Sequence, residues 1–170
     1  RLALVDSNGL AREERSIEEL LSHKAVVVLA EPGMGKTVLL KSLETKARRY
    51  FRARRFLLQE SDPKVGAVLI DGLDEARAGD RHGPTLEGIM ARLEKFSLPS
   101  FVMTCRSGDW FGEADRARIL EGIGYGDLVV AQLQPLSREE ALAIAKRFTN
   151  DAEGLIREAH QRGLSELLLS

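Results

Sequence analysis

The residue types between positions 30 and 37 are those that proteins use to hold a phosphate chain. Gly33 and Gly35 lack a Cβ, so the backbone can bend there and direct its N–H groups at an anion. Lys36 adds a mobile positive charge for the β- and γ-phosphates, and the Thr37 hydroxyl can ligate Mg²⁺. The spacing departs from the strict P-loop pattern at its first position, where Ala30 replaces glycine. The predicted nucleotide contacts are Glu31, Pro32, Gly33, Met34, Gly35, Lys36, Thr37 and Val38.

A cluster of acids follows the apolar run 67–70. Mg²⁺ prefers oxygen ligands, so we expect Asp71 to hold the metal together with Thr37. Hydrolysis of a γ-phosphate also requires a water molecule that is oriented and relieved of a proton. Glu75 is the predicted catalytic base, with Asp74 beside it. The alternative is that these acids form a solvated turn that caps a following helix.

Arg106 ends a third apolar run, 101–105, and completes the set of candidate catalytic residues with Lys36 and the two acids. The carboxyl ends of parallel strands meet at one edge of a sheet, so Arg106 should lie near the phosphate loop. A guanidinium at that point can detect a γ-phosphate and spread its charge in the transition state. The alternative is a surface arginine paired with Asp109 or Glu113. Cys105 is expected in the core and not as a nucleophile, since no histidine lies near it in sequence.

The elements that must position these clusters follow from the apolar patterns. The β-branched run 26–30 predicts a buried strand before the loop, and the residues after the loop predict a helix that reaches about 50–51. Further strands are predicted at 56–58, 67–71, 101–106 and 127–131, and the run 2–5 is also apolar. Further helices are predicted at 16–22, 85–96, 109–121, 137–148 and 151–161, the last ended by Gly163. Together they predict a three-layer α/β fold around a parallel sheet of about five strands.

The stretch 46–55 contains six basic side chains and no acid. One interpretation is a solvated helix end, where cations suit the negative pole of the helix dipole. The other is a surface for nucleic acid, with aromatic residues between the cations. The residues between 58 and 65 are too few for a helix that connects two parallel strands, so either the chain is abbreviated there or residues are missing from this sequence.

Composition indicates an ordinary globular chain. Of the 170 residues, 44% are hydrophobic and 30% are charged, and the formal net charge of -1 favours neither nucleic acid nor acidic membranes. No apolar run reaches the roughly 18 residues of a membrane span, and no signal-peptide pattern is present. A single cysteine fits a reducing cytoplasm. The sequence begins without Met and ends in a Leu-rich segment, so we expect it to be part of a longer protein.

Three segments together resemble the NACHT branch of the STAND NTPases: 30–37, 70–75 and 103–106. The string Asp-Gly-Leu-Asp-Glu at 71–75 is the most specific of them, because ordinary AAA-plus proteins usually show Asp-Glu directly after the strand. The segment 133–141 resembles the connection from the core of these proteins to a small helical subdomain. The strand tip differs, since it has Thr-Cys-Arg-Ser where the family often has Thr-Ser-Arg-Pro.

The resemblance implies roles for the candidate residues and an AAA-like strand order. Lys36 and Thr37 correspond to the Walker A residues, and Arg106 corresponds to the sensor arginine. The extended Walker B residues are Asp71, Asp74 and Glu75. It also implies a lead-in over 1–15, an NTPase core over 16–135 and the start of the helical subdomain over 136–170.

The function implied is that of a bacterial signalling switch, often one used in antiviral defence. Such a protein binds ATP or ADP with Mg²⁺ and hydrolyses ATP slowly. When a fused sensor domain finds its trigger, it self-associates through the NTPase domain and activates a fused effector domain. Two alternatives remain open. One is an AAA-plus ATPase motor, and the other is a nucleotide-stabilised assembly module that binds nucleic acid through 46–55. The choice of ATP over GTP depends on the resemblance alone.

Overall fold

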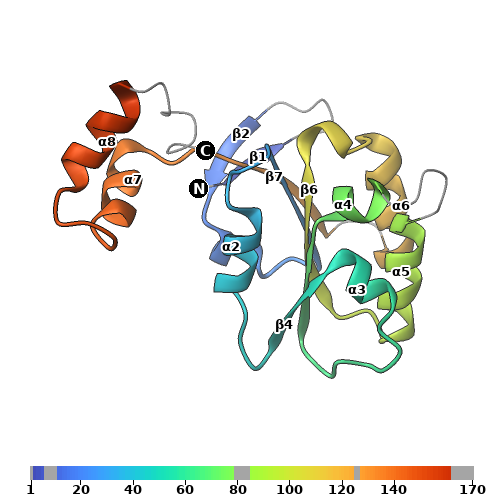
Figure 1. The fold of residues 1–170 in the computed structure, drawn as a ribbon. Helices are drawn as coiled ribbons and strands as arrows, with labels where there is room; N and C mark the ends of the chain where they lie inside the picture. Colours follow the sequence, from blue (N-terminus) through green and yellow to red (C-terminus); the bar gives the residue numbers. More distant parts are fainter. Residues whose placement is uncertain (1, 6–10, 79–84, 125–126, 162–170) are drawn as a thin grey trace.

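The strands that precede the predicted site clusters lie side by side in one sheet. The computed structural model describes residues 2–5, 11–78, 85–124 and 127–161, and within them seven strands form a sheet of order β2-β1-β7-β3-β6-β5-β4 (Figure 1). The strands are β1 (Leu2–Val5), β2 (Ala11–Arg15), β3 (Ala25–Ala30), β4 (Arg48–Arg52), β5 (Ala67–Asp71), β6 (Ser100–Arg106) and β7 (Leu128–Leu133).

Strands β7, β3, β6, β5 and β4 are parallel, as the sequence predicts, and β1 and β2 extend the sheet in antiparallel fashion. The predicted lead-in thus contributes two strands to the main sheet. The predicted α/β fold with a mostly parallel sheet is confirmed.

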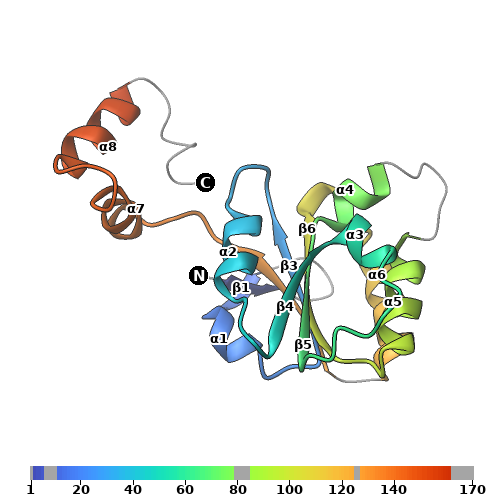
Figure 2. The ribbon, with the colours of Figure 1, turned by 60° about the horizontal axis from the view of Figure 1, so that its bottom comes forward.

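Helices cover both faces of the sheet, which gives the three predicted layers (Figure 2). The helices are α1 (Ile17–Leu20), α2 (Lys36–Ser42), α3 (Ala53–Leu57), α4 (Leu73–Ala78), α5 (Thr85–Lys95), the 3₁₀ turn η1 (Ser107–Asp109), α6 (Glu113–Ile123), α7 (Arg138–Ala145) and α8 (Ala152–Gln161). One core lies under α3 to α6, and a second core lies under α1 and α2. Strand β3 is buried along its whole length and supplies side chains to both cores, Val27 and Leu29 to the first and Val26 and Val28 to the second.

The largest departure from the sequence analysis concerns the residues after the phosphate loop. Helix α2 ends at Ser42, and the basic stretch forms the edge strand β4 and the start of α3, so the prediction of a solvated helix end there is wrong. The strand predicted at 56–58 is also wrong, because Phe56 belongs to α3. Phe51 and Phe56 meet in the core with ring centroids 5.6 Å apart. The burial of both rings decides the local structure, and α3 then supplies the connection between β4 and β5.

The predicted helix caps agree with the structure, and one predicted helix start does not. Both capping boxes are present, at Ser16 with Glu19 and at Ser137 with Glu140. Helix α6 begins at Glu113, after η1, and not at 109.

The pair α7 and α8 stands apart from the sheet, beyond the segment 134–137 (Figure 1). Gly163 lies outside the described residues. No helix in the described part of the chain has both the length and the apolar character to cross a bilayer.

Candidate phosphate-binding site

The loop between β3 and α2 has the backbone that its two glycines predict. Gly33 has a φ of 89° and Gly35 a φ of 80°, values that side-chain-bearing residues rarely adopt. Gly35 is the N-cap of α2, so the loop passes directly into the helix. The ammonium group of Lys36 turns back over the loop and donates to the carbonyl oxygens of Ala30, at 2.9 Å, and Glu31, at 3.1 Å.

The candidate residues from the three clusters line one pocket of about 300 Å³ at the carboxyl edge of the sheet. Its lining residues are Pro32, Gly33, Gly35, Lys36, Thr37, Asp71, Gly72, Asp74, Glu75 and Arg106. The strand register explains the convergence, because Ala30 at the end of β3 pairs with Arg106 at the end of β6. Three predicted contacts are outside this lining: Glu31, Met34 and Val38, of which Val38 is 71% exposed.

Asp71 is buried among hydroxyl groups. Its Oδ2 accepts hydrogen bonds from Thr37, at 2.7 Å, and from Tyr50, at 2.8 Å, while its Oδ1 accepts one from Thr104 at 2.8 Å. Thr104 Oγ1 also accepts the N–H of Gly72, at 2.9 Å. Hydroxyl donors satisfy the lone pairs of the carboxylate without cancelling its charge.

Thr37 and Asp71 supply the hard oxygen atoms that suit Mg²⁺. In the described residues, no three His, Cys, Asp or Glu side chains gather at metal-binding spacing. A protein that binds Mg²⁺ through one carboxylate leaves most coordination positions to substrate phosphates and water. The side chains around Asp71 therefore fit Mg²⁺ that arrives with a phosphate ligand better than a metal held by protein alone.

Tyr50 is a member of this cluster that the sequence analysis missed. Burial, with a further effect from the hydrogen bond to Asp71, raises its pKa to about 12, so the phenol remains a donor at neutral pH. A strand assignment for 48–52 could have found it. Arginines at 49 and 52 flank the two aromatic residues there, and the buried side chain is Phe51.

Asp74, unlike Asp71, has its charge cancelled by an arginine. Its Oδ2 lies 2.9 Å from Arg106 Nε, and its Oδ1 accepts the main-chain N–H of Arg106 at 3.2 Å. The partner of Arg106 is therefore Asp74 and not Asp109 or Glu113. Asp74 is 6% exposed, whereas Glu75, the next residue on α4, is exposed. The alternative of a solvated acidic turn does not fit a buried, paired Asp74.

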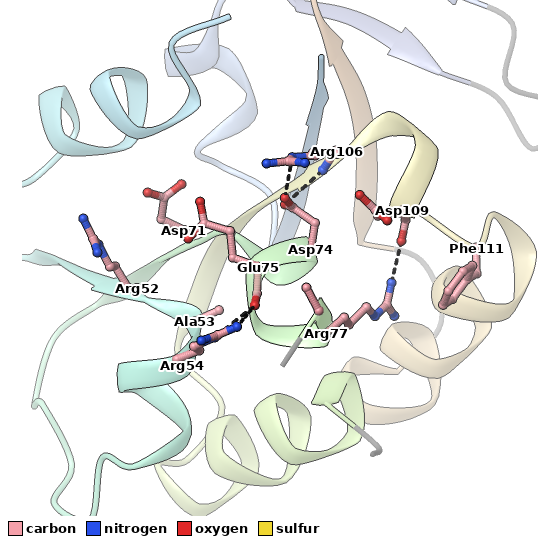
Figure 3. Close-up of a pocket in the computed structure, with 12 residues that line it drawn as sticks. Arg52, Ala53, Arg54, Asp71, Asp74, Glu75, Arg77, Arg106, Asp109 and Phe111 are labelled. Atoms are coloured by element: carbon pink, nitrogen blue, oxygen red, sulfur yellow. Dashed lines mark hydrogen bonds and ion pairs between the residues drawn. The ribbon is translucent and has the colours of Figure 1, made fainter. Parts of the chain in front are cut away.

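A larger cavity, of about 590 Å³, adjoins the phosphate pocket (Figure 3). Its lining residues are Arg52, Ala53, Arg54, Asp71, Gly72, Asp74, Glu75, Arg77, Ala78, Arg106, Asp109 and Phe111. Arg77 forms an ion pair with the buried Asp115, at 2.6 Å, donates to the carbonyl of Asp109, and lies 4.6 Å from the centroid of the Phe111 ring. These contacts hold α4 against the segment that follows β6.

Two further predictions concern residues near the site. Cys105 is fully buried, and burial, together with the charge of Asp74, raises the pKa of its thiol to about 12, so its assignment to the core is confirmed. In the basic stretch, Arg48 donates to the carbonyl of Leu43 and Arg54 to that of Glu75. Two of its cations thus have structural contacts, and a nucleic-acid surface there stays a prediction.

Comparisons with known proteins give the fold. No protein-family profile and no curated protein matches the chain. Among solved structures, AMPPCP-bound DnaA from Aquifex aeolicus matches with a TM-score of 0.52 and 16% identity, over 96% of this chain and 67% of that one. A crystal structure of a DNA replication initiation factor matches with a TM-score of 0.51 and 16% identity, over 89% of this chain. This chain spans 60% of the length of that second structure. At these identities, the matches show a shared fold alone.

Proposed function

We propose that this chain binds ATP with Mg²⁺ and hydrolyses it slowly, and that the bound nucleotide sets the state of a switch. The observation that supports this proposal is the 300 Å³ pocket, where residues from three separate segments meet at one rim of the sheet. Its cationic and acidic lining residues are Lys36, Asp71, Asp74, Glu75 and Arg106. A structural glycine turn would not require these charged groups beside it. The fold shared with AMPPCP-bound DnaA is consistent with a nucleotide at this place.

In this proposal the phosphate loop binds the nucleotide, and the acids hold the metal and activate the attacking water. The N–H groups of the loop and the Lys36 ammonium hold the β- and γ-phosphates, while Thr37 and Asp71 hold Mg²⁺. The metal, when bound, neutralises charge on the phosphate oxygens. Glu75, whose carboxylate is on the exposed side of α4, orients the attacking water and accepts its proton.

Arg106 is the proposed sensor of the γ-phosphate. Its guanidinium pairs with Asp74, so a γ-phosphate would compete with that carboxylate for the same cation. A diphosphate lacks the competing group. The two nucleotides would then differ in their interaction with Arg106, and a ligand shifts a conformational equilibrium only through such a difference.

The finer assignment is a NACHT-type STAND switch that resides in a larger protein. It is supported by the Asp-Gly-Leu-Asp-Glu string at 71–75 and by the helical pair α7–α8 that follows the core. Its nucleotide state would control self-association through this domain, in response to a sensor domain and to activate an effector domain, both outside this chain. An AAA-plus motor would differ by steady, fast turnover that depends on protein concentration, because a neighbouring copy would supply a catalytic arginine.

The first test removes the cation of the phosphate loop. Lys36→Ala should weaken binding of a non-hydrolysable ATP analogue by about 1.5–3 kcal/mol, the usual contribution of a charged hydrogen bond. Isothermal titration calorimetry measures the affinity. Lys46→Ala, which removes an exposed lysine outside the pocket, is the matched control and should bind like the parent. An unchanged affinity in Lys36→Ala would rule out the phosphate loop as the nucleotide site.

The second test separates binding from hydrolysis. Glu75→Gln should bind ATP like the parent and hydrolyse it roughly 10²–10⁴ times more slowly, because a positioned base contributes that factor. Single-turnover release of phosphate measures the rate. Glu60→Gln, at an exposed position away from the pocket, is the control. Equal rates in Glu75→Gln and the parent would remove Glu75 as the base and leave Asp74 for that role.

A further inference from the structure

The cavity beside the phosphate pocket is too large for the water that hydrolysis needs. Its volume of about 590 Å³ is within the range of small-molecule sites, roughly 300–1,000 Å³, whereas one water takes about 30 Å³. The two pockets share a wall, which consists of Asp71, Gly72, Asp74, Glu75 and Arg106. A molecule in the larger cavity would therefore touch the same acids from the side opposite the phosphate loop.

The arginines on the walls of this cavity fall into two kinds. Arg77 and Arg106 are each paired with a buried carboxylate, at 2.6 Å and 2.9 Å. Arg52 and Arg54 form no ion pair in the described part of the chain. Arg52 has a side-chain hydrogen bond with Tyr50, and Arg54 donates through Nε and Nη2 to the carbonyl oxygen of Glu75. The wall formed by the end of β4 and the start of α3 thus carries two guanidinium groups that form no ion pair in the described residues, although Asp71 and Glu75 also line this cavity (Figure 3).

Apolar surface complements this charge. Ala53 and Ala78 line the cavity, and Phe111 is 64% exposed at its rim. The Phe111 ring packs against Arg77, whose own charge is already neutralised by Asp115. The cavity therefore offers two guanidinium groups that are in no ion pair of the described residues, with small apolar groups near them. Guanidinium groups bind phosphate in a planar, two-point geometry that a lysine cannot reproduce.

We propose that this cavity is a second ligand site, which takes a phosphate-bearing small molecule through Arg52 and Arg54. The inference deepens the proposed function, on which it depends for the identity of the ligand in the adjoining pocket. An occupant would face Glu75 and would control the access of water to that carboxylate. The second ligand would thus regulate hydrolysis at the neighbouring site.

The test uses inorganic pyrophosphate, titrated calorimetrically into the protein in magnesium-free buffer. Pyrophosphate can also bind the phosphate loop, so the parent should bind two equivalents and Lys36→Ala should retain the one in the cavity. On the Lys36→Ala background, Arg52→Gln/Arg54→Gln should weaken the remaining binding by about tenfold or more, because charge-assisted hydrogen bonds are lost. Arg52→Gln alone, which keeps the contact between Arg54 and Glu75, should weaken it by a smaller factor.

The matched control is Arg49→Gln/Arg55→Gln on the same background. It also removes two exposed positive charges from β4 and α3, but neither residue lines the cavity, so pyrophosphate affinity should be unchanged. Equal weakening by the two double variants would show a general charge effect and overturn the proposal, as would no weakening by either. The proposed function fails separately, if the parent does not bind the ATP analogue, whatever the pyrophosphate result.

Discussion

Two buried acids at the rim of the sheet, three residues apart, are stabilised in different ways. Asp71 is surrounded by the hydroxyl groups of Thr37, Tyr50 and Thr104, which satisfy its oxygens but leave its charge uncancelled. Asp74 has its charge cancelled by Arg106. The part of the rim around Asp71, here called the hydroxyl side, is thus suited to receive a cation. On the arginine side, formed by Asp74 and Arg106, an arriving anion could replace Asp74 as the partner of Arg106.

The arginine side continues away from the pocket, through Arg77 and Asp115, and there it has a structural role. From this difference we expect that a cation next to an acid stabilises the fold where both are buried, and that in the proposed function it meets a ligand where the cation reaches solvent. Arg77 has a side chain that is 17% exposed, whereas that of Arg106 is 47% exposed. The following substitutions test this division, from the largest expected effect to the smallest.

Arg77→Met should destabilise the protein most. It leaves Asp115, whose side chain is 6% exposed, charged and without its cation. Breaking a buried ion pair by removing one partner costs about 3–5 kcal/mol. Urea denaturation followed by circular dichroism measures the free energy of unfolding. Arg116→Met is the control, because Arg116 is next to Asp115 on α6 but forms no ion pair in the described residues. A loss below about 1 kcal/mol in Arg77→Met would contradict the structural role.

Asp71→Asn tests the hydroxyl side. It removes the uncancelled charge while keeping the shape of the side chain, so the magnesium dependence of ATP-analogue binding should weaken by about 100-fold or more. Titrations with and without Mg²⁺ measure this dependence. Asp74→Asn, on the arginine side, should keep the parent's magnesium dependence. The division between the two acids is wrong if both variants respond to Mg²⁺ alike.

Thr104→Val should have an intermediate effect on stability. The buried hydroxyl donates to Asp71 and accepts the N–H of Gly72, and a valine leaves both of these groups without that partner. A buried polar group left unsatisfied costs about 1–3 kcal/mol. The midpoint of urea unfolding measures the loss. Thr45→Val, at an exposed position, is the control, and an equal change in the two variants would argue against the buried bonds.

Tyr50→Phe should have the smallest effect, about 1 kcal/mol at neutral pH for one hydrogen bond. The folded-state pKa of about 12 lies above the unfolded value of about 10, so the stabilisation is fully present below pH 10 and is lost as the pH rises toward 12. Parent stability should therefore fall more steeply than that of Tyr50→Phe above pH 10. Cys105 also has a raised pKa, but it is common to both proteins and cancels. Parallel pH profiles would show that Tyr50 does not donate to Asp71.

The sequence predicted the parts of the site that follow buried strands. Val26 to Ala30 and Val68 to Ile70 are apolar on both faces, so their polar ends had to lie at one edge, and Arg106 follows from the same rule. The prediction failed where an edge strand mixes aromatic and basic residues. In β4 the arginines flank Tyr50 and Phe51, and periodicity alone did not distinguish this from a helix end.

Side-chain contacts between different strands and helices could not be predicted from the sequence, for a different reason. The partner of Arg106 could have been any nearby acid, and the pairing with Asp74 depends on how α4 leaves β5. Likewise, the approach of Tyr50 to Asp71 requires β4 to lie beside β5, with Arg52 paired to Asp71 in the register. Such contacts depend on strand order, which local patterns do not specify.

The two carbonyl groups that hold Lys36 have a thermodynamic consequence for any ligand of the loop. The ammonium ion is already solvated by the chain itself, through the oxygens of Ala30 and Glu31. An arriving phosphate therefore substitutes for existing partners and does not meet a bare charge. The affinity measured in solution will report the difference between two sets of contacts, and it will understate the strength of the new one.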